Sequence, residues 1–259
     1  MANILIAGDS WGAGVFDPWG DTGYEYTGLG MHTHLETLGH KIKNISRGGC
    51  SNQTILDRLN GILEFNGAGV FDKTDKRDKF TWEEIDHVIF LQTDIFREHY
   101  YYGKQNPHDT KGQWKILKQN FVDSLLNYNS LNDFIDQYFQ NLYTKINAVA
   151  EKNNKKILCV GGWSQLHPSI VNYPNLIPAI YSATKLLLPQ LKQDVYLSDP
   201  EWYTQLDRDD RIMEKFGTEF KQMTVTNGEK LKLIYNNWQD VHPNLQGYGQ
   251  IVDVLVKYF

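Results

Sequence analysis

The chain has few cysteines, no long apolar run and no excess of positive charge. Two of its 259 residues are cysteines, Cys50 and Cys159, and their spacing matches no zinc site, so we expect two buried thiols. No stretch approaches the roughly eighteen consecutive apolar residues of a membrane-spanning helix. The formal net charge of -5 gives no basic surface of the kind that binds nucleic acid. We therefore expect no membrane and no nucleic acid among the partners.

The N-terminus also lacks the pattern of a signal peptide. It has no basic segment, and its first apolar run stops at Gly8, which is too short for the apolar core of such a peptide. We therefore expect a cytoplasmic location by default, and we expect this run to form a strand. The hydrophobic fraction of 41% and the aromatic fraction of 13% supply enough side chains for a sizeable core.

Short runs rich in Ile, Leu and Val alternate with segments of helical periodicity. This alternation is typical of parallel strands joined by crossover helices. We expect a three-layer α/β/α fold with a central parallel sheet, flavodoxin-like, in a single domain over residues 1–259. Two irregular segments, near 97–130 and 198–230, are predicted to be insertions. The predicted strands are Asn3–Ala7, Lys41–Ile45, His87–Leu91 and Lys156–Val160, and the clearest helices are Asn52–Leu63 and Leu131–Ala150.

A serine between two glycines follows the first predicted strand, in the sequence Gly8-Asp9-Ser10-Trp11-Gly12. Ser10 should therefore lie at the carboxyl end of that strand, where open parallel sheets bind ligands. The segment also matches G-x-S-x-G, the nucleophile turn of α/β-hydrolases, but several strands precede that turn and only seven residues precede Gly8. A dinucleotide-binding G-x-G-x-x-G and a Walker A loop are both absent. None of these three folds is therefore indicated.

Four short blocks resemble, in the same order, the blocks that define the SGNH (GDSL-like) hydrolases. They are GDS at 8–10, NISRGG at 44–49, LQTD at 91–94 and DVHP at 240–243. The first three follow the first three predicted strands, and the fourth precedes the last predicted helix. The resemblance implies the SGNH hydrolase type of α/β/α fold and a serine-dependent hydrolysis of carboxylic esters.

The resemblance also assigns the nucleophile and the oxyanion hole. It makes Ser10 the nucleophile and the source of one backbone N-H, and it makes Gly49 the source of a second, with Gly48 as the adjacent alternative. A glycine suits this place because no Cβ keeps its N-H away from the developing oxyanion. The family's third donor is an asparagine, and Thr93 stands in its place, so we expect Thr93 or the neighbouring Gln92 to donate.

His242 is the expected general base, and Asp240 is the expected acid that orients it. In the family the acid precedes the histidine by three residues. Here Asp240 precedes His242 by two, and Gln239 occupies the usual position of the acid. Pro243 is expected to begin the final helix. The chain therefore resembles the family with a shortened spacing between acid and base.

Four side chains near the predicted strand ends are candidates for substrate binding. They are Trp11, Gln92, Asp94 and Trp163. Aromatic rings pack well against sugar rings. The resemblance to the SGNH hydrolases implies an O-acetylated glycan as the expected substrate, within the wider class of small-molecule and glycan esters.

The sequence indicates no metal and no other cofactor. His32 and His34 form an H-x-H pair, but no third ligand is recognisable nearby. Two other functions stay open. Since the third block lacks its usual glycine and asparagine, the chain would also suit a catalytically weak SGNH-like module that binds carbohydrate. The loop from Gly8 to Gly14 would suit a flavodoxin-like domain that binds a phosphate or a nucleotide.

Overall fold

The computed structural model describes residues 1–14, 16–17, 25–26, 30–46, 50–61, 80–93, 95, 120–162, 164–187, 210–223, 238–239, 242–243 and 245–259. At 16–17, 25–26, 220–223, 238–239 and 242 it describes the backbone, and at the other positions the side chains as well.

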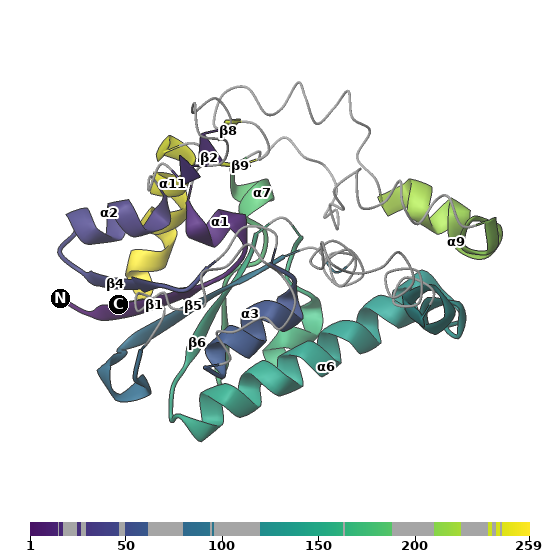
Figure 1. Ribbon diagram of the computed structural model, residues 1–259, viewed down its shortest axis with the longest axis horizontal. Coiled ribbons are helices and arrows are strands. Elements are labelled where there is room, and N and C mark those ends of the chain that lie inside the picture. Colours follow the sequence, from purple (N-terminus) through teal and green to yellow (C-terminus); the bar gives the residue numbers. More distant parts are fainter. Residues whose placement is uncertain are drawn as a thin grey trace.

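Five parallel strands form the central sheet, in the order β4-β1-β5-β6-β7 (Figure 1). Since β1 lies between β4 and β5, the chain leaves β1 toward one edge of the sheet and later returns to build the other side. Sheets of this kind bind ligands at such a switch point, outside the carboxyl ends of the strands. The strands are β1 (Asn3–Ala7), β4 (Lys41–Asn44), β5 (His87–Gln92), β6 (Ile157–Gly161) and β7 (Leu176–Ile180).

Helices cover both faces of the sheet, so the core has two layers (Figure 1). Successive side chains of a strand point to opposite faces, and β1 places Leu5 in one layer and its neighbours Ile4 and Ile6 in the other. The predicted α/β/α fold with a central parallel sheet is therefore confirmed. The first layer packs under α3 (Asn52–Leu59) and α6 (Leu131–Lys152), and the second under α2 (Met31–Thr37), α7 (Ala183–Leu187) and α11 (Leu245–Leu255).

All four predicted strands are present, each to within one residue at either end. A fifth strand, β7, was not predicted, because Pro178 interrupts its short apolar run. Proline cannot donate to a sheet, and β7 lies at the edge, where it pairs with β6 alone. Helix α3 ends at Leu59, earlier than predicted, because Gly61 adopts a φ of 80°, outside the helical region.

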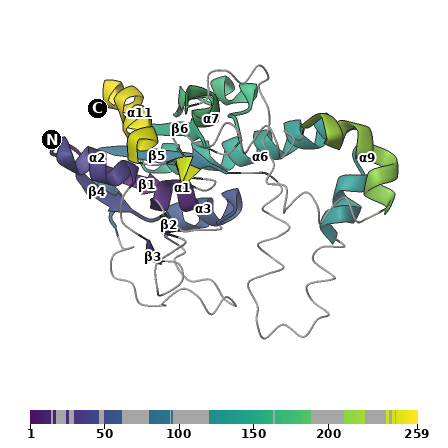
Figure 2. The same ribbon diagram turned by 90° about the horizontal axis from the view of Figure 1, so that it is seen from above.

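The described parts of the two predicted insertions pack against each other. Residues 120–126 are helical, and α9 (Asp210–Met223) lies beside them at the far end of α6 (Figures 1 and 2). Arg211 forms an ion pair with Asp123 at 3.1 Å, and Lys215 Nζ donates to the Leu126 carbonyl at 2.6 Å. The two segments therefore form one extension of the layer that contains α3 and α6.

The remaining described elements are short. Pro243 lies in a two-residue strand, and α11 begins at Leu245, so the predicted helix start was two residues too early. None of the helices in the described ranges combines the length and the apolar composition that crossing a membrane requires. The short elements are α1 (Ser10–Ala13), η2 (Trp82–Glu84), η3 (Pro168–Asn172), η4 (Val256–Tyr258) and the paired strands β2 (Phe16–Asp17) with β3 (Glu25–Tyr26) and β8 (Trp238–Gln239) with β9 (His242–Pro243).

Candidate active site

Ser10 is the first residue of α1, a one-turn helix that begins just after β1. Asp9 caps this helix, because its carboxylate accepts the Trp11 N-H at 2.9 Å and its carbonyl accepts the N-H groups of Gly12 and Ala13. Ser10 itself is only 4% exposed. The cap therefore fixes the backbone that carries the Ser10 hydroxyl at the carboxyl end of β1.

The second block of the sequence pattern packs directly against α1. Asn44 Nδ2 donates to the Gly12 carbonyl at 2.8 Å, and Asn44 Oδ1 accepts the Ser46 N-H at 3.0 Å. Gly12 permits this approach, since a Cβ added there would lie 3.0 Å from the Ser46 Cβ. Gly14 ends the helix with a φ of 119°, which side chains rarely allow. Side chains at the end of β4 and just after it thus hold the helix of Ser10 in place.

Thr93 is buried, and its hydroxyl faces the cap of α1. Thr93 Oγ1 donates to Asp9 Oδ2 at 2.6 Å, and the Thr93 N-H donates to Asn52 Oδ1 at 2.9 Å. A hydroxyl has one hydrogen to donate, and Thr93 is 0% exposed. In this structure Asp9 takes that hydrogen, whereas the sequence predicted that Thr93 donates it to an oxyanion.

The side-chain amide of Gln92 also forms hydrogen bonds inside the protein. Its Nε2 donates to the Gln165 carbonyl at 2.7 Å and to Ser164 Oγ at 3.3 Å, and its Oε1 accepts from the Tyr143 hydroxyl at 2.7 Å. Gln92 is 1% exposed. The sequence predicted that Gln92 binds substrate or replaces Thr93 as a donor, and in this structure its amide contacts other parts of the protein. Gln92 thus ties α6 and the segment after β6 to the end of β5.

Trp11 lies in the core. It is 1% exposed and belongs to the apolar layer that includes Ile6 and Met31. A Cβ added to Gly162 would lie 3.6 Å from Trp11 Cε3, so the chain after β6 covers one side of the indole. The sequence predicted that Trp11 binds substrate, and in this structure its ring packs in the core and anchors α1.

The segment of His242 lies next to the helix of Ser10. The His242 backbone belongs to β9, where it pairs with Gln239 of β8. β9 and α1 have Cα atoms within 8 Å of each other. Four other residues of the sequence prediction, and the side chain of His242, lie outside the described part of the chain: Gly49, Asp94, Trp163 and Asp240.

Helix α11 adds a buried tyrosine near the cap of α1. Burial raises the pKa of Tyr248, and the negative charge of Asp9 raises it further. The Tyr248 hydroxyl has no hydrogen-bond partner among the residues that the structure describes. The sequence did not single out Tyr248, since it follows the apolar spacing of a helix that packs on the sheet.

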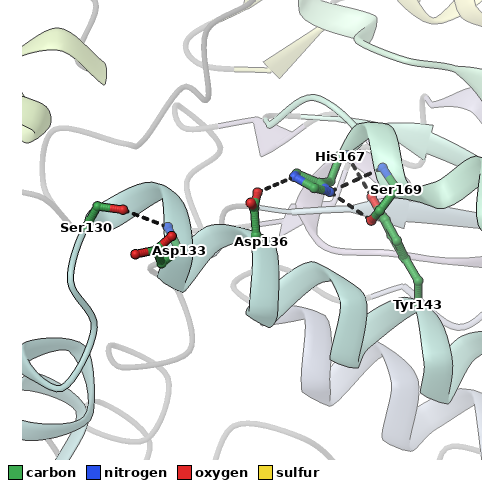
Figure 3. Close-up of polar contacts among 6 residues, drawn as sticks. All are labelled: Ser130, Asp133, Asp136, Tyr143, His167 and Ser169. Carbon is green, nitrogen blue, oxygen red and sulfur yellow. Dashed lines mark hydrogen bonds and ion pairs between the residues drawn. The ribbon is translucent and has the colours of Figure 1, made fainter.

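Another serine, histidine and aspartate come together between α6 and η3 (Figure 3). His167 Nε2 lies 2.8 Å from Asp136 Oδ1, and His167 Nδ1 lies 2.8 Å from Ser169 Oγ. The Ser169 N-H also donates to Nδ1, at 3.3 Å, so the ring acts as the N-cap of η3. Because Nδ1 accepts that N-H, Nε2 carries the hydrogen that faces Asp136. This cluster therefore closes a turn and ties it to α6.

His32 and His34, the H-x-H pair of the sequence, both lie in α2. His34 Nε2 lies 2.8 Å from the Leu245 carbonyl, at the start of α11. Over the ranges that the structure describes, no group of three or more His, Cys, Asp or Glu side chains is arranged to hold a metal ion. Cys50 and Cys159 are buried free thiols, as expected, and burial raises the pKa of Cys159.

Several solved structures are similar to this chain. A lipase/acylhydrolase from Enterococcus faecalis is 13% identical, with 100% of this chain and 95% of that chain covered and a TM-score of 0.36. An acetyl xylan esterase from Butyrivibrio proteoclasticus is 12% identical, with 99% and 62% covered and a TM-score of 0.42. A member of the lipolytic protein G-D-S-L family from Veillonella parvula is 13% identical, with 99% and 97% covered and a TM-score of 0.36. No protein-family model and no curated protein matches the chain.

Proposed function

We propose that this chain is a serine-dependent hydrolase of carboxylic esters, of the SGNH type, with Ser10 as its nucleophile. The observation that carries the proposal is that α1, which begins with Ser10, lies next to β9, which begins with His242. The two segments come from opposite ends of the sequence and meet at the switch point of a parallel sheet. A hydroxyl and a histidine are the pair that an acyl-enzyme mechanism requires.

In the proposed reaction, His242 takes the Ser10 proton while Ser10 Oγ attacks the ester carbonyl. The N-H groups of Ser10 and Gly49 donate to the tetrahedral oxyanion. The alcohol leaves with the proton that His242 carried, and a water molecule then releases the acid by the same route. Asp240 is the proposed partner that orients His242 and stabilises its charged form.

The oxyanion hole of this proposal has two backbone donors and no side-chain donor. The hydroxyl of Thr93 donates to Asp9, and the amide of Gln92 donates to the segment after β6. Losing one oxyanion donor typically costs about 2.7 to 4 kcal/mol of transition-state stabilisation. We therefore expect a lower kcat than a site with three donors would give.

We propose an O-acetylated glycan as the substrate, contacted by Asp94 and Trp163, which follow β5 and β6 in the sequence. Short acyl groups should then be preferred. Rates on p-nitrophenyl acetate, butyrate and octanoate, and acetate release from acetylated xylan, would test this. A faster rate on octanoate than on acetate, with no acetate released from xylan, would contradict the acetyl-glycan assignment.

Labelling with a fluorophosphonate probe tests the nucleophile. The probe should phosphonylate Ser10, and peptide mapping should place the label there. Ser10→Ala should abolish the label, and His242→Asn should slow labelling on the order of 1,000-fold, since the hydroxyl then has no base. Ser169→Ala is the matched control, because Ser169 contacts the ring of His167 as part of the N-cap of η3, and this variant should label at the wild-type rate. A label that persists in Ser10→Ala would contradict the proposal.

A second candidate is a module of the same fold that binds an acetylated glycan without cleaving it. The internal use of Thr93 and Gln92 favours it, because both side chains are unavailable to an oxyanion. This candidate predicts no phosphonylation of the wild-type protein together with thermal stabilisation by acetylated xylan fragments. Labelled Ser10 would exclude it.

A further inference from the structure

A buried carboxylate and a buried threonine meet at the switch point of the sheet. Asp9 precedes Ser10 at the end of β1, and Thr93 follows β5, the neighbouring strand. Thr93 Oγ1 donates to Asp9 Oδ2 at 2.6 Å, which is short for a hydrogen bond from a hydroxyl. Asp9 is 2% exposed and Thr93 is 0% exposed. Little solvent therefore weakens the contact, and it links two strands directly behind the nucleophile.

The backbone of Thr93 is held on both sides. Its N-H donates to Asn52 Oδ1 at 2.9 Å, and its carbonyl accepts from Asn52 Nδ2 at 3.0 Å and from Ser164 Oγ at 3.0 Å. Asn52 is 0% exposed and is the first residue of α3. With the backbone fixed in this way, the position of the Thr93 hydroxyl is set by α3 and by the segment after β6.

Asp9 transmits that position to the nucleophile. Its Oδ1 accepts the Trp11 N-H at 2.9 Å while its Oδ2 accepts the Thr93 hydroxyl, so both oxygens of one rigid carboxylate are engaged. Ser10 lies between Asp9 and Trp11, the two residues that the hydrogen bond from the Trp11 N-H to the carboxylate joins. A rotation of the Asp9 carboxylate would therefore turn the first residue of α1, which carries the Ser10 hydroxyl.

We propose that Thr93 is a positioning residue that acts on Ser10 through Asp9. This inference rests on the proposed function, since it takes Ser10 as the nucleophile. Thr93 thus occupies the sequence position of the family's oxyanion donor but has a different role. It fixes the position of Ser10 through Asp9 and does not contact the substrate. Misplacing reacting groups by about 1 Å can cost on the order of 100-fold in rate, which sets the size of the expected effect.

The test is the rate at which a fluorophosphonate labels Ser10 in five variants. Thr93→Val keeps the shape of the side chain but removes the donor, and it should slow labelling on the order of 100-fold. Thr93→Ser restores a hydroxyl and should recover a rate within about tenfold of wild type. Thr37→Val is the matched control, because Thr37 Oγ1 donates to the Thr33 carbonyl within α2, and it should label at the wild-type rate.

Asp9→Ala separates positioning from oxyanion donation, because alanine removes the contact with Thr93. In a double variant with Thr93→Val, a residue that acts through Asp9 adds little to the loss already caused by Asp9→Ala. An oxyanion donor would add its own loss in full. A double variant within about threefold of Asp9→Ala supports the inference, and additive losses overturn it.

Three further outcomes decide how the test is interpreted. If Thr93→Val does not fold, as judged by circular dichroism, Asp9→Ala alone tests the link. Alanine can contact neither the Thr93 hydroxyl nor the Trp11 N-H, so a wild-type labelling rate in that variant overturns the inference. If wild-type protein is not labelled at all, the proposed function fails, and the inference fails with it. Equal labelling of wild type and Thr93→Val overturns the inference alone.

Discussion

At the scale of single residues, two buried tyrosines differ in what their hydroxyls meet. The Tyr143 hydroxyl donates to Gln92 Oε1 at 2.7 Å and accepts the His167 N-H at 2.8 Å (Figure 3 shows the contact with His167). The Tyr248 hydroxyl has no hydrogen-bond partner among the described residues, and it lies near the charge of Asp9. One hydroxyl therefore joins three elements, and the other is a desolvated polar group.

Replacing each tyrosine by phenylalanine should change stability in opposite directions. Tyr143→Phe leaves buried groups of Gln92 and His167 without a partner and should lower the free energy of unfolding by about 1 to 3 kcal/mol. Tyr248→Phe removes an unpaired hydroxyl and should leave stability unchanged or raise it by up to about 2 kcal/mol. Urea denaturation of the two variants measures both values. A large loss in Tyr248→Phe would mean that its hydroxyl has a partner in solution.

The sequence located Ser10 correctly at the end of the first strand but did not reveal the hydrogen-bond partners of the side chains around it. Position after a strand is a local property, which a short pattern can reveal. The tasks of Thr93 and Gln92 depend on partners far away in the chain, since Asp9 is 84 residues from Thr93 and Tyr143 is 51 residues from Gln92. No pattern within one block contains that information.

At the scale of elements, α1 is too short to be stable by itself, so its geometry depends on its neighbours. The cap from Asp9, the hydrogen bond from Asn44 and the close approach of Ser46 to Gly12 hold it. A change that separates α1 from β4 should therefore affect both stability and the reactivity of Ser10.

Gly12→Ala tests this packing. The added methyl group would meet the Ser46 side chain, so the variant should lose about 1 to 3 kcal/mol of stability and label more slowly at Ser10. Gly217→Ala is the matched control within α9, where the added Cβ would lie 3.2 Å from the flexible end of Met213. Alanine favours helix over glycine, so this control should be neutral or more stable. Thermal melts and labelling rates of both variants provide the comparison, and equal losses would contradict the role of α1.

Elements with a strong local pattern could be predicted from the sequence, and those shaped by tertiary contacts could not. Strands β1, β4, β5 and β6 are short runs rich in branched residues, and α6 has a regular apolar stripe. β7 escaped prediction because Pro178 weakens its pattern, although an edge strand tolerates proline. β8 and β9 are two residues each, too short for any periodicity to appear.

At the scale of the whole molecule, the end of the sheet opposite Ser10 carries titrating groups at the start of β5. The backbone N-H of Asn3 donates to Asp86 at 2.7 Å and is the main cause that lowers the pKa of Asp86. Burial lowers the pKa of His87; the charge of Asp86 opposes this shift, and those of His40 and Lys155 add to it. Both groups therefore release their protons more readily in the folded chain.

The free energy of unfolding should consequently fall with acid in two steps. The unfolded chain takes up a proton at His87 near its ordinary value of 6.5, while the folded chain resists until lower pH, so stability falls as pH drops below about 6.5. For Asp86 the same reasoning places a second loss below its ordinary value of 3.8. Urea denaturation between pH 8 and 3 measures the free energy of unfolding as a function of pH. His87→Gln should flatten the first step and Asp86→Asn the second, and unchanged profiles would contradict these assignments.

The pairing of α1 with β9 also has a consequence for the order in which the protein is made. Synthesis begins at the N-terminus, so Ser10 leaves the ribosome early, whereas β9 and α11 are among the last described elements to appear. Under the proposed mechanism, a growing chain holds a serine with no base beside it. Esterase activity would therefore arise only when the segment that contains β9 and α11 packs against the sheet. Incomplete chains in the cell would not hydrolyse esters.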